Sequence, residues 1–353
     1  MQKFLGILFM TGKKNRNIFN VLFLIIVFVA TMYSVFYNED LSSIISYIRN
    51  ADSRYFFIGV IFVLIFIECE SVVIYYMLKG LGENVLFSHC CLYSFAGFFF
   101  SLITPSATGG QPAQLYFMKK DGLPLTVSTM VLVIVTITYK LVLVAAGMLV
   151  FIFRPQGIMQ YLSPATGWCV LGMALNIICI VVMFIFVFHP AFAGNTASFI
   201  INIAGRIKII KNKQKYMDKL VLAMDKYKDS ASYFASHKFV IWNVFCITAF
   251  QRIILFAVTY IVCISFNTAD AGLFTITGLQ AMISVAVDML PLPGGMGITE
   301  NLFKEIFTPL CGKNLVLPVM IVSRGISYYT QLLISAVMSA VAYFKIVYRK
   351  GIQ

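Results

Sequence analysis

Charged residues are scarce in this sequence. Asp, Glu, Lys and Arg make up 12% of its 353 residues, whereas soluble domains carry about 25%. Hydrophobic residues make up 60%, and the mean hydropathy is +0.89. This composition excludes a soluble globular domain and predicts an all-α polytopic membrane protein, because helices satisfy their own backbone hydrogen bonds in lipid.

Acidic residues are the scarcer of the two charge types. The chain has 14 Asp and Glu against 27 Lys and Arg, which gives a formal net charge of +13. In a soluble protein such an excess would indicate nucleic-acid binding. In a membrane protein, basic loops facing the cytoplasm and its anionic lipids account for it, so we expect no nucleic-acid partner.

Sequence patterns for catalysis or metal binding are missing as well. The eight cysteines form no C-x-x-C pair, and the three histidines are far apart. There is no P-loop and no arrangement of a nucleophile with a base. We therefore predict no catalytic residue, no metal site and no cofactor.

Long apolar runs divide the chain into membrane spans of the ~20 residues that a bilayer requires. Clear candidates are residues 18–37, 55–78, 123–153, 167–188, 239–266 and 315–344. The first run is too long for the apolar core of a signal peptide, and Glu39-Asp40 follows it instead of a small-residue cleavage site. We predict that it stays as an uncleaved first span.

Two further regions, about 85–118 and 272–312, contain stretches that break helices. The first stretch is Thr104-Pro105-Ser106-Ala107-Thr108-Gly109-Gly110-Gln111-Pro112, and the second is Leu290-Pro291-Leu292-Pro293-Gly294-Gly295-Met296-Gly297-Ile298-Thr299-Glu300. Broken backbone at membrane depth survives only where it is buried in protein or lines a polar cavity. Two interrupted segments in corresponding halves of a chain indicate the binding site of a transporter.

The distribution of Lys and Arg sets the orientation. The basic loop 190–238 and both termini are predicted to be cytoplasmic, which forces regions 85–118 and 272–312 each to begin and end on one side. We therefore predict six full spans and two re-entrant helical hairpins, arranged as an inverted repeat of residues 55–153 and 239–344. Periodic apolar residues in 196–233 fit either interfacial amphipathic helices or a solvated helical hairpin.

Ionisable side chains inside the predicted spans and hairpins are the strongest functional signal, because each costs about 2.5 kcal/mol or more at a helix centre. The set is Glu68, Glu70, Lys140, Arg252, Asp288, Glu300 and Arg324. One interpretation is that they pair with one another as internal ion pairs. The other, which we favour, is a polar path for a charged lipid headgroup. Backbone N–H groups at the hairpin helix ends would suit a phosphate.

The two break stretches resemble the signatures of the lysylphosphatidylglycerol synthase transmembrane (flippase-like) family, the membrane half of MprF. The resemblance covers nearly the whole chain. Its motif positions here are Pro105, Gly109, Gly110, Gln111, Pro293, Gly294, Gly295, Gly297 and Glu300. Thr104, Ser106 and Thr108 add hydroxyl groups to the first motif.

The resemblance implies a flippase in the bacterial plasma membrane. Such a protein moves aminoacylated phosphatidylglycerol between leaflets, lowers the negative surface charge and gives resistance to cationic antimicrobial peptides. MprF adds a C-terminal aminoacyltransferase domain, and the chain to Gln353 leaves no room for one. We therefore do not expect the chain to be an enzyme by itself.

Two other functions stay open. The first is a phosphatidylglycerol lysyltransferase, dependent on lysyl-tRNA, that works with a separate aminoacyl-lipid synthase. The second is a non-transporting membrane scaffold whose basic loop docks an anionic surface. A membrane phospholipid is the expected partner in the leading hypothesis, and a homo-oligomer is possible in all three.

Overall fold

The computed structural model describes residues 41–206, 213–292 and 294–348. The described residues form helices and contain no strand. The helices are α3 (Leu41–Asn50), α4 (Ser53–Gly80), α5 (Phe87–Leu102), α6 (Gly110–Lys120), α7 (Leu125–Phe153), α8 (Gln156–Leu162), α9 (Thr166–Phe188), α10 (Pro190–Arg206), α11 (Lys213–Ser236), α12 (Lys238–Ser265), α13 (Gly272–Val287), α14 (Ile298–Arg324) and α15 (Gln331–Ala342). The π-helical segments Gly325–Thr330 and Tyr343–Tyr348 flank α15.

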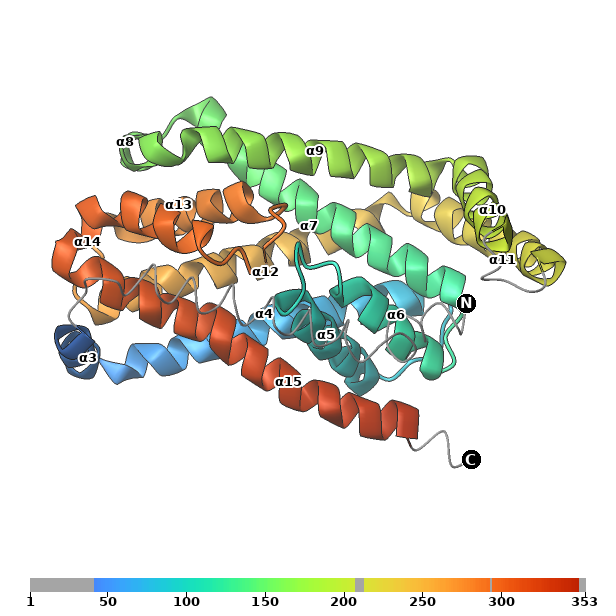
Figure 1. The fold of residues 1–353 in the computed structure, drawn as a ribbon, viewed down its shortest axis with the longest axis horizontal. Helices are drawn as coiled ribbons and strands as arrows, with labels where there is room; N and C mark the ends of the chain where they lie inside the picture. Colours follow the sequence, from blue (N-terminus) through green and yellow to red (C-terminus); the bar gives the residue numbers. More distant parts are fainter. Residues whose placement is uncertain (1–40, 207–212, 293, 349–353) are drawn as a thin grey trace.

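The helices form an elongated bundle whose long members run along its axis (Figure 1). Within the described residues, five helical stretches are long and apolar enough to cross a membrane: Ser53–Gly80, Leu125–Phe153, Gln156–Val187, Lys238–Ser265 and Ile298–Tyr348. Each predicted span from 55–78 onward extends beyond the matching stretch by at most two residues, so the all-α polytopic fold is confirmed. The predicted first span, 18–37, lies outside the described residues.

Helices α5 and α6 form the first hairpin. They pack against each other, and their connecting loop reaches the middle of the bundle (Figure 1). At the other end of the pair, His89 Nδ1 lies 2.5 Å from Asp121 Oδ2, and the Tyr93 hydroxyl also donates to that carboxylate. The hairpin therefore begins and ends at the end of the bundle that carries α10 and α11 (Figure 1).

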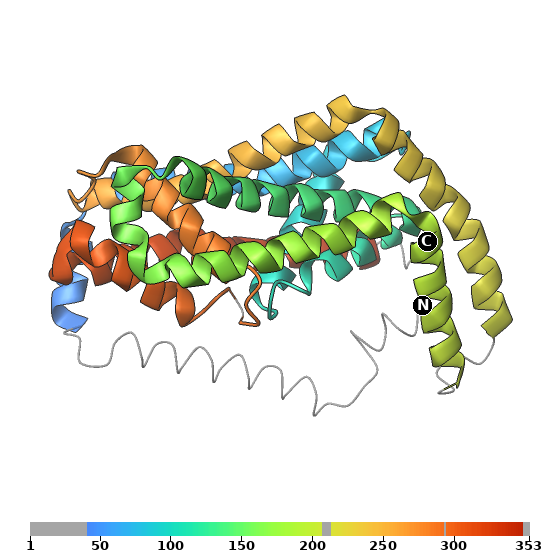
Figure 2. The same cartoon turned by 90° about the horizontal axis from the view of Figure 1, so that it is seen from above.

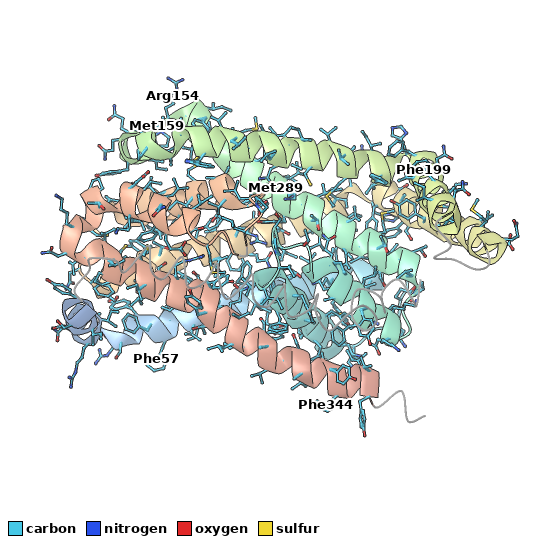
Figure 3. The ribbon with its side chains drawn as sticks, viewed as in Figure 1. Phe57, Arg154, Met159, Phe199, Met289 and Phe344 are labelled. Carbon is cyan, nitrogen blue, oxygen red and sulfur yellow. The ribbon has the colours of Figure 1, made fainter. Side chains whose placement is uncertain are left out.

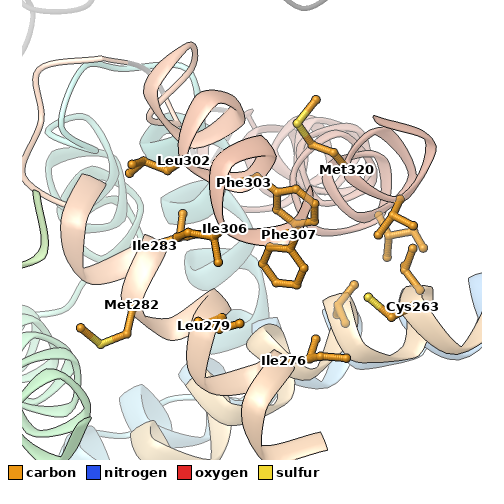
Figure 4. Close-up of a cluster of buried hydrophobic side chains, with 14 of the residues drawn as sticks. Cys263, Ile276, Leu279, Met282, Ile283, Leu302, Phe303, Ile306, Phe307 and Met320 are labelled. Atoms are coloured by element: carbon orange, nitrogen blue, oxygen red, sulfur yellow. The ribbon is translucent and has the colours of Figure 1, made fainter. Parts of the chain in front are cut away.

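The second hairpin comes from the opposite end of the bundle. It consists of α13 and the first part of α14, which is interrupted at Gly312 (φ 75°, ψ 160°). Both α13 and α14 pack on α8. Leu279, Ile283, Phe303 and Phe307 are among the side chains between them (Figure 4), and the two Phe rings stack with their centroids 4.2 Å apart.

The two hairpins thus approach from opposite ends, and the chain reverses at Gly312 before the last long helix. The distribution of Lys and Arg predicts, in addition, that each of these regions begins and ends on one side of the membrane. Re-entry of the hairpins into a bilayer, the inverted repeat and the cytoplasmic termini stay predictions.

Candidate functional site

The loops at the tips of the two hairpins touch each other. We call residues 103–109 the first break loop and residues 288–297 the second break loop. The Ser106 hydroxyl donates to the Leu290 carbonyl at 3.1 Å. The Tyr328 hydroxyl, from the π-helical segment after α14, donates to the Leu102 carbonyl at 2.8 Å. Ser106 and Leu290 are 184 residues apart in sequence, and they meet in the middle of the bundle.

Neutral hydrogen bonds hold the first break loop. The Thr104 hydroxyl donates to the Phe100 carbonyl at 2.6 Å and accepts from the Gly109 N–H at 2.8 Å. Ser106 and Ala107 have positive φ values of 49° and 54°, which non-glycine residues seldom adopt. Because the lost helical hydrogen bonds are replaced within the loop, the chain can reverse at this depth.

Charges hold the second break loop. The guanidinium of Arg324 donates to Glu300 Oε1 through Nε and Nη2, both at 2.9 Å, and Nη2 also donates to the Gly294 carbonyl at 3.0 Å. Glu300 Oε2 accepts from the Gly297 N–H at 2.7 Å. Gly294 has a φ of 57°, and a Cβ there would lie 2.2 Å from the Tyr328 ring. The loop therefore requires glycine at this position.

A second ion pair fixes the start of the same loop. Lys140 Nζ on α7 lies 2.9 Å from Asp288 Oδ2 and donates to Asn176 Oδ1 on α9 at 3.1 Å. The Tyr139 hydroxyl donates to the other carboxylate oxygen of Asp288. Lys140 also lies 2.9 Å from the Met289 sulfur, which Figure 3 labels in the middle of the bundle. The pair joins α7 and α9 to the second hairpin.

A cavity of about 570 Å³ lies beside the two break loops. Ligand pockets commonly have volumes of ~300–1,000 Å³. Its lining mixes aromatic and apolar residues from α4, α7 and α12 with the charged residues Glu70, Lys140, Arg252, Asp288 and Arg324. Ser106, Thr108, Gln111, Gly294 and Gly295 from the hairpin motifs also line it.

Arg252 differs from the other two cations of the cavity. Its guanidinium carbon lies 3.8 Å from the centroid of the Tyr139 ring and 4.9 Å from that of Phe66. Its Nε is buried and has no hydrogen-bond partner. In the part of the chain that the structure describes, no carboxylate lies within the 4.0 Å of an ion pair with Arg252. The side chain is therefore held by aromatic rings, with donors left over for an anion.

Glu70 supplies a carboxylate to the same cavity. Its Oε1 accepts from Gln114 Nε2 of α6 at 2.6 Å. Gln251, next to Arg252 on α12, donates to the Phe66 carbonyl at 2.9 Å and also interacts with Glu70. Glu70 and Arg252 attract each other within the cavity, but no ion pair within 4.0 Å joins them.

Comparison with known protein families matches residues 18–335 to the transmembrane region of lysylphosphatidylglycerol synthase. The chain belongs to this family. No curated protein matched the chain. A multi-pass membrane protein with a lipid-related role follows from the family and the five apolar helices.

Within this family fold, most of the predicted site residues lie at the cavity or beside it. The structure brings ten of them to the cavity: Glu70, Ser106, Thr108, Gln111, Lys140, Arg252, Asp288, Gly294, Gly295 and Arg324. Thr104, Pro105, Gly109, Gly110, Gly297 and Glu300 belong to the break loops and the helix starts beside them but are not among its lining residues. Pro293 lies outside the described residues. Their roles with a lipid stay predictions.

Glu68 lies elsewhere. It lines a shallow apolar groove with Leu64, Ile65 and Ile247, and it accepts a hydrogen bond from the Cys91 thiol at 3.1 Å. Two positions along a helix turn a side chain by ~200°, so Glu68 and Glu70 face different sides of α4. The sequence does not show which of the two carboxylates faces the cavity, because both faces of α4 are apolar.

Uncharged residues complete the site, and sequence reasoning missed them. Tyr139, Gln114, Gln251 and Tyr328 line the cavity, and Asn176 holds Lys140. Amides and phenols are less costly in a membrane than charges, so a search for charge passes over them. A signal was present for Tyr139, which directly precedes Lys140.

Proposed function

We propose that this protein moves the headgroup of a phospholipid, aminoacylated phosphatidylglycerol above all, through the cavity between the two break loops. The observation that carries the proposal is Arg252, a cation without an ion-pair partner among the described residues, in a cavity that it shares with Glu70. The lipid-related family supports the choice of substrate.

The phosphodiester would bind at Arg252. A guanidinium offers five N–H donors in a fixed plane and forms strong charge-assisted hydrogen bonds with phosphate. Lys140 and Arg324 also line the cavity, but each already lies 2.9 Å from a carboxylate oxygen. We therefore assign the phosphate to Arg252 and a supporting role to the other two cations.

The ammonium group of an aminoacyl headgroup would bind at Glu70. One oxygen of this carboxylate accepts from Gln114, and a carboxylate has room for about four hydrogen bonds. Asp288 serves less well, because Lys140 and Tyr139 already contact its two oxygens. A lipid with both a phosphate and an amine would then satisfy Arg252 and Glu70 together.

Passage through the cavity would require the break loops to separate. Ser106 and Leu290 join the two loops, and beside them the carbonyl of Leu102, the last residue of α5, accepts from Tyr328 in the segment after α14. Both contacts are single neutral hydrogen bonds, each worth about 0.5–1.5 kcal/mol net. Such contacts can open and close during transport. In a bacterial plasma membrane, the result would be a less negative outer surface and resistance to cationic antimicrobial peptides.

The test measures lipid movement in proteoliposomes that contain lysylphosphatidylglycerol with a fluorescent acyl chain, using a reductant that bleaches only the outer leaflet. We expect Arg252→Gln to slow movement by roughly tenfold or more, because a hydrogen bond to a charged group contributes about 1.5–3 kcal/mol. The matched control is Arg154→Gln, an exposed arginine at the end of α7 (Figure 3). Equal rates for the two variants would contradict the proposal.

A second comparison separates the phosphate from the amine. Glu70→Gln should slow fluorescent lysylphosphatidylglycerol more than fluorescent phosphatidylglycerol, whereas Arg252→Gln should slow both. Glu305→Gln, an exposed carboxylate on α14, is the control for Glu70→Gln. If Glu70→Gln slows both lipids equally, the amine does not bind there.

The family description also keeps a synthase role as the second candidate. In that case the membrane region would hold lipid for a lysyltransferase. Formation of lysylphosphatidylglycerol from lysyl-tRNA and phosphatidylglycerol by the purified chain would establish this activity. A scaffold, by contrast, would depend on the basic loop 190–238 and would tolerate Arg252→Gln.

A further inference from the structure

Helix α10 exposes an apolar stripe. Phe192, Phe199 and Ile203 are 49%, 63% and 41% exposed. Their spacing of seven and four residues places them on one face of the helix. On another face, Gly194 lies against Met224 of α11, with 3.6 Å between the position of a Cβ and the Met224 methyl. One side of α10 is thus packed. The described residues leave the stripe largely uncovered, although the Phe192 ring also meets the Phe186 ring of α9 edge-on, with centroids 5.2 Å apart.

The stripe does not belong to a membrane span. With 17 residues, α10 is shorter than the ~20 residues that a span requires. Helices α10 and α11 also run across the end of the bundle, roughly perpendicular to the long helices (Figure 2). Figure 3 labels Phe199 on this crosswise helix. An exposed apolar stripe in this orientation indicates contact with an apolar surface that lies crosswise at this end of the bundle.

The helical hairpin formed by α10 and α11 is fixed to the bundle by contacts with α9 and α4. The Tyr227 hydroxyl of α11 donates to the Phe186 carbonyl of α9 at 2.8 Å. At the end of α11, the Tyr233 ring stacks on His237 with centroids 4.1 Å apart, and Tyr233 also lies against Gly80 at the end of α4. The position of α10 relative to the spanning helices is therefore set by the fold.

Two features identify what covers the stripe. The exposed apolar face of α9, which includes Val181, Val182 and Ile185, leads directly to α10 through His189. Residues 190–238 contain nine Lys and Arg but three Asp; Arg206 at the end of α10 is one of the nine, and the other eight follow this helix. An apolar stripe that continues a lipid-facing surface, within a basic segment, is typical of a helix at an anionic membrane surface.

We infer that α10 lies in the boundary between the headgroups and acyl chains of an anionic bilayer, with Phe192, Phe199 and Ile203 inserted among the acyl chains. The α10–α11 hairpin is then a membrane-surface element of the protein, separate from the cavity. The partner is the lipid surface itself, and anionic lipid should strengthen the contact.

A tryptophan probe tests this position in the whole protein. Phe199→Trp is made in a background with Trp168→Phe and Trp242→Phe, because these are the two native tryptophans. The variant is reconstituted in vesicles of phosphatidylglycerol and phosphatidylcholine brominated near the top of the acyl chain. We expect a blue-shifted emission, loss of most of its intensity to the bromolipid, and little quenching by iodide.

The matched control is Asp218→Trp in the same background, an exposed position on α11. It should be quenched by iodide and little by the bromolipid. The inference is wrong if Phe199→Trp behaves like this control, because the stripe then faces water. It is also wrong if Phe199→Trp is shielded from both quenchers, because protein then covers the stripe. Phe192→Trp gives an independent measurement on the same face.

Without anionic lipid, in vesicles of phosphatidylcholine alone, quenching of Phe199→Trp by the bromolipid should fall and quenching by iodide should rise. Unchanged quenching would show that anionic lipid does not strengthen the contact. Every variant is compared by size-exclusion elution with the parent, so that only folded protein is scored.

Discussion

The two break loops do the same structural task with different chemistry. The first break loop is held by hydroxyl groups, above all Thr104 between the Phe100 carbonyl and the Gly109 N–H. The second is held by two ion pairs, Glu300–Arg324 and Lys140–Asp288. Removing one partner of a buried ion pair costs about 3–5 kcal/mol, against about 1–3 kcal/mol for a neutral partner. The second loop is therefore the more strongly fixed of the two.

Exposure follows the same division. Pro105, Ala107 and Thr108 of the first break loop are exposed, whereas Pro291 of the second is exposed but its Gly295 and Met296 are buried. A loop with weak, exposed contacts opens at a lower free-energy cost than one clamped by buried charges. In the account of lipid transport given above, the first break loop moves and the second provides a fixed wall. Three substitutions and one cross-link test this difference between the two loops.

The largest effect is expected at Glu300. Glu300→Ala leaves Arg324 without its carboxylate and removes the acceptor for the Gly297 N–H. We expect a loss of about 3–5 kcal/mol in the free energy of unfolding, as for other broken buried pairs. Denaturant unfolding in detergent micelles measures it. Glu305→Ala, on the exposed side of the same helix, should change stability by less than about 0.5 kcal/mol.

A somewhat smaller effect is expected at Lys140, because the Tyr139 hydroxyl still donates to Asp288 when Lys140 is removed. Lys140→Met leaves Asp288 without its cation and the Asn176 side-chain oxygen without its donor, and should cost about 3 kcal/mol. Adding Asp288→Asn should restore much of that loss, because the remaining charge is removed. If the double variant loses as much as the sum of the single variants, the two residues do not act as a pair.

The smallest effect on stability is expected in the first break loop. Thr104→Val removes one donor and one acceptor and should cost about 1–2 kcal/mol. Because this loop is the one proposed to move, the rate of lipid movement should change clearly even though the free energy of unfolding changes little. Thr129→Val on α7 is the control, because it loses a similar bond from a hydroxyl to the carbonyl four residues earlier but lies outside both loops and the cavity lining. A rate unchanged in Thr104→Val would place the moving part elsewhere.

The sequence alone predicts the elements of this fold well. Apolar runs of more than 20 residues and two clusters of Pro and Gly leave few alternatives, so the spans from 55–78 onward and both breaks fall where the structure has them. The breaks stand out because Pro and Gly at membrane depth are costly unless other groups replace the lost hydrogen bonds.

Partners across the site could not be predicted in the same way. Lys140 and Asp288 are 148 residues apart, and their pairing depends on how α7 packs against the second hairpin. Sequence also gives no reason why Arg252, rather than Lys140 or Arg324, should be the cation without an ion-pair partner among the described residues. Such distinctions come from the packing of helices whose surfaces are apolar on every side.

Separation of the two break loops during transport is the central claim, and a cross-link between them tests it most directly. Ser106→Cys combined with Leu290→Cys places one thiol on each loop, at two residues whose side-chain hydroxyl and backbone carbonyl lie 3.1 Å apart. The parent protein and each single variant, treated with the same oxidant, serve as controls for the native cysteines. The account predicts that oxidation stops movement of fluorescent lysylphosphatidylglycerol in the double variant alone and that a reductant restores it. Undiminished lipid movement with the loops joined would contradict it.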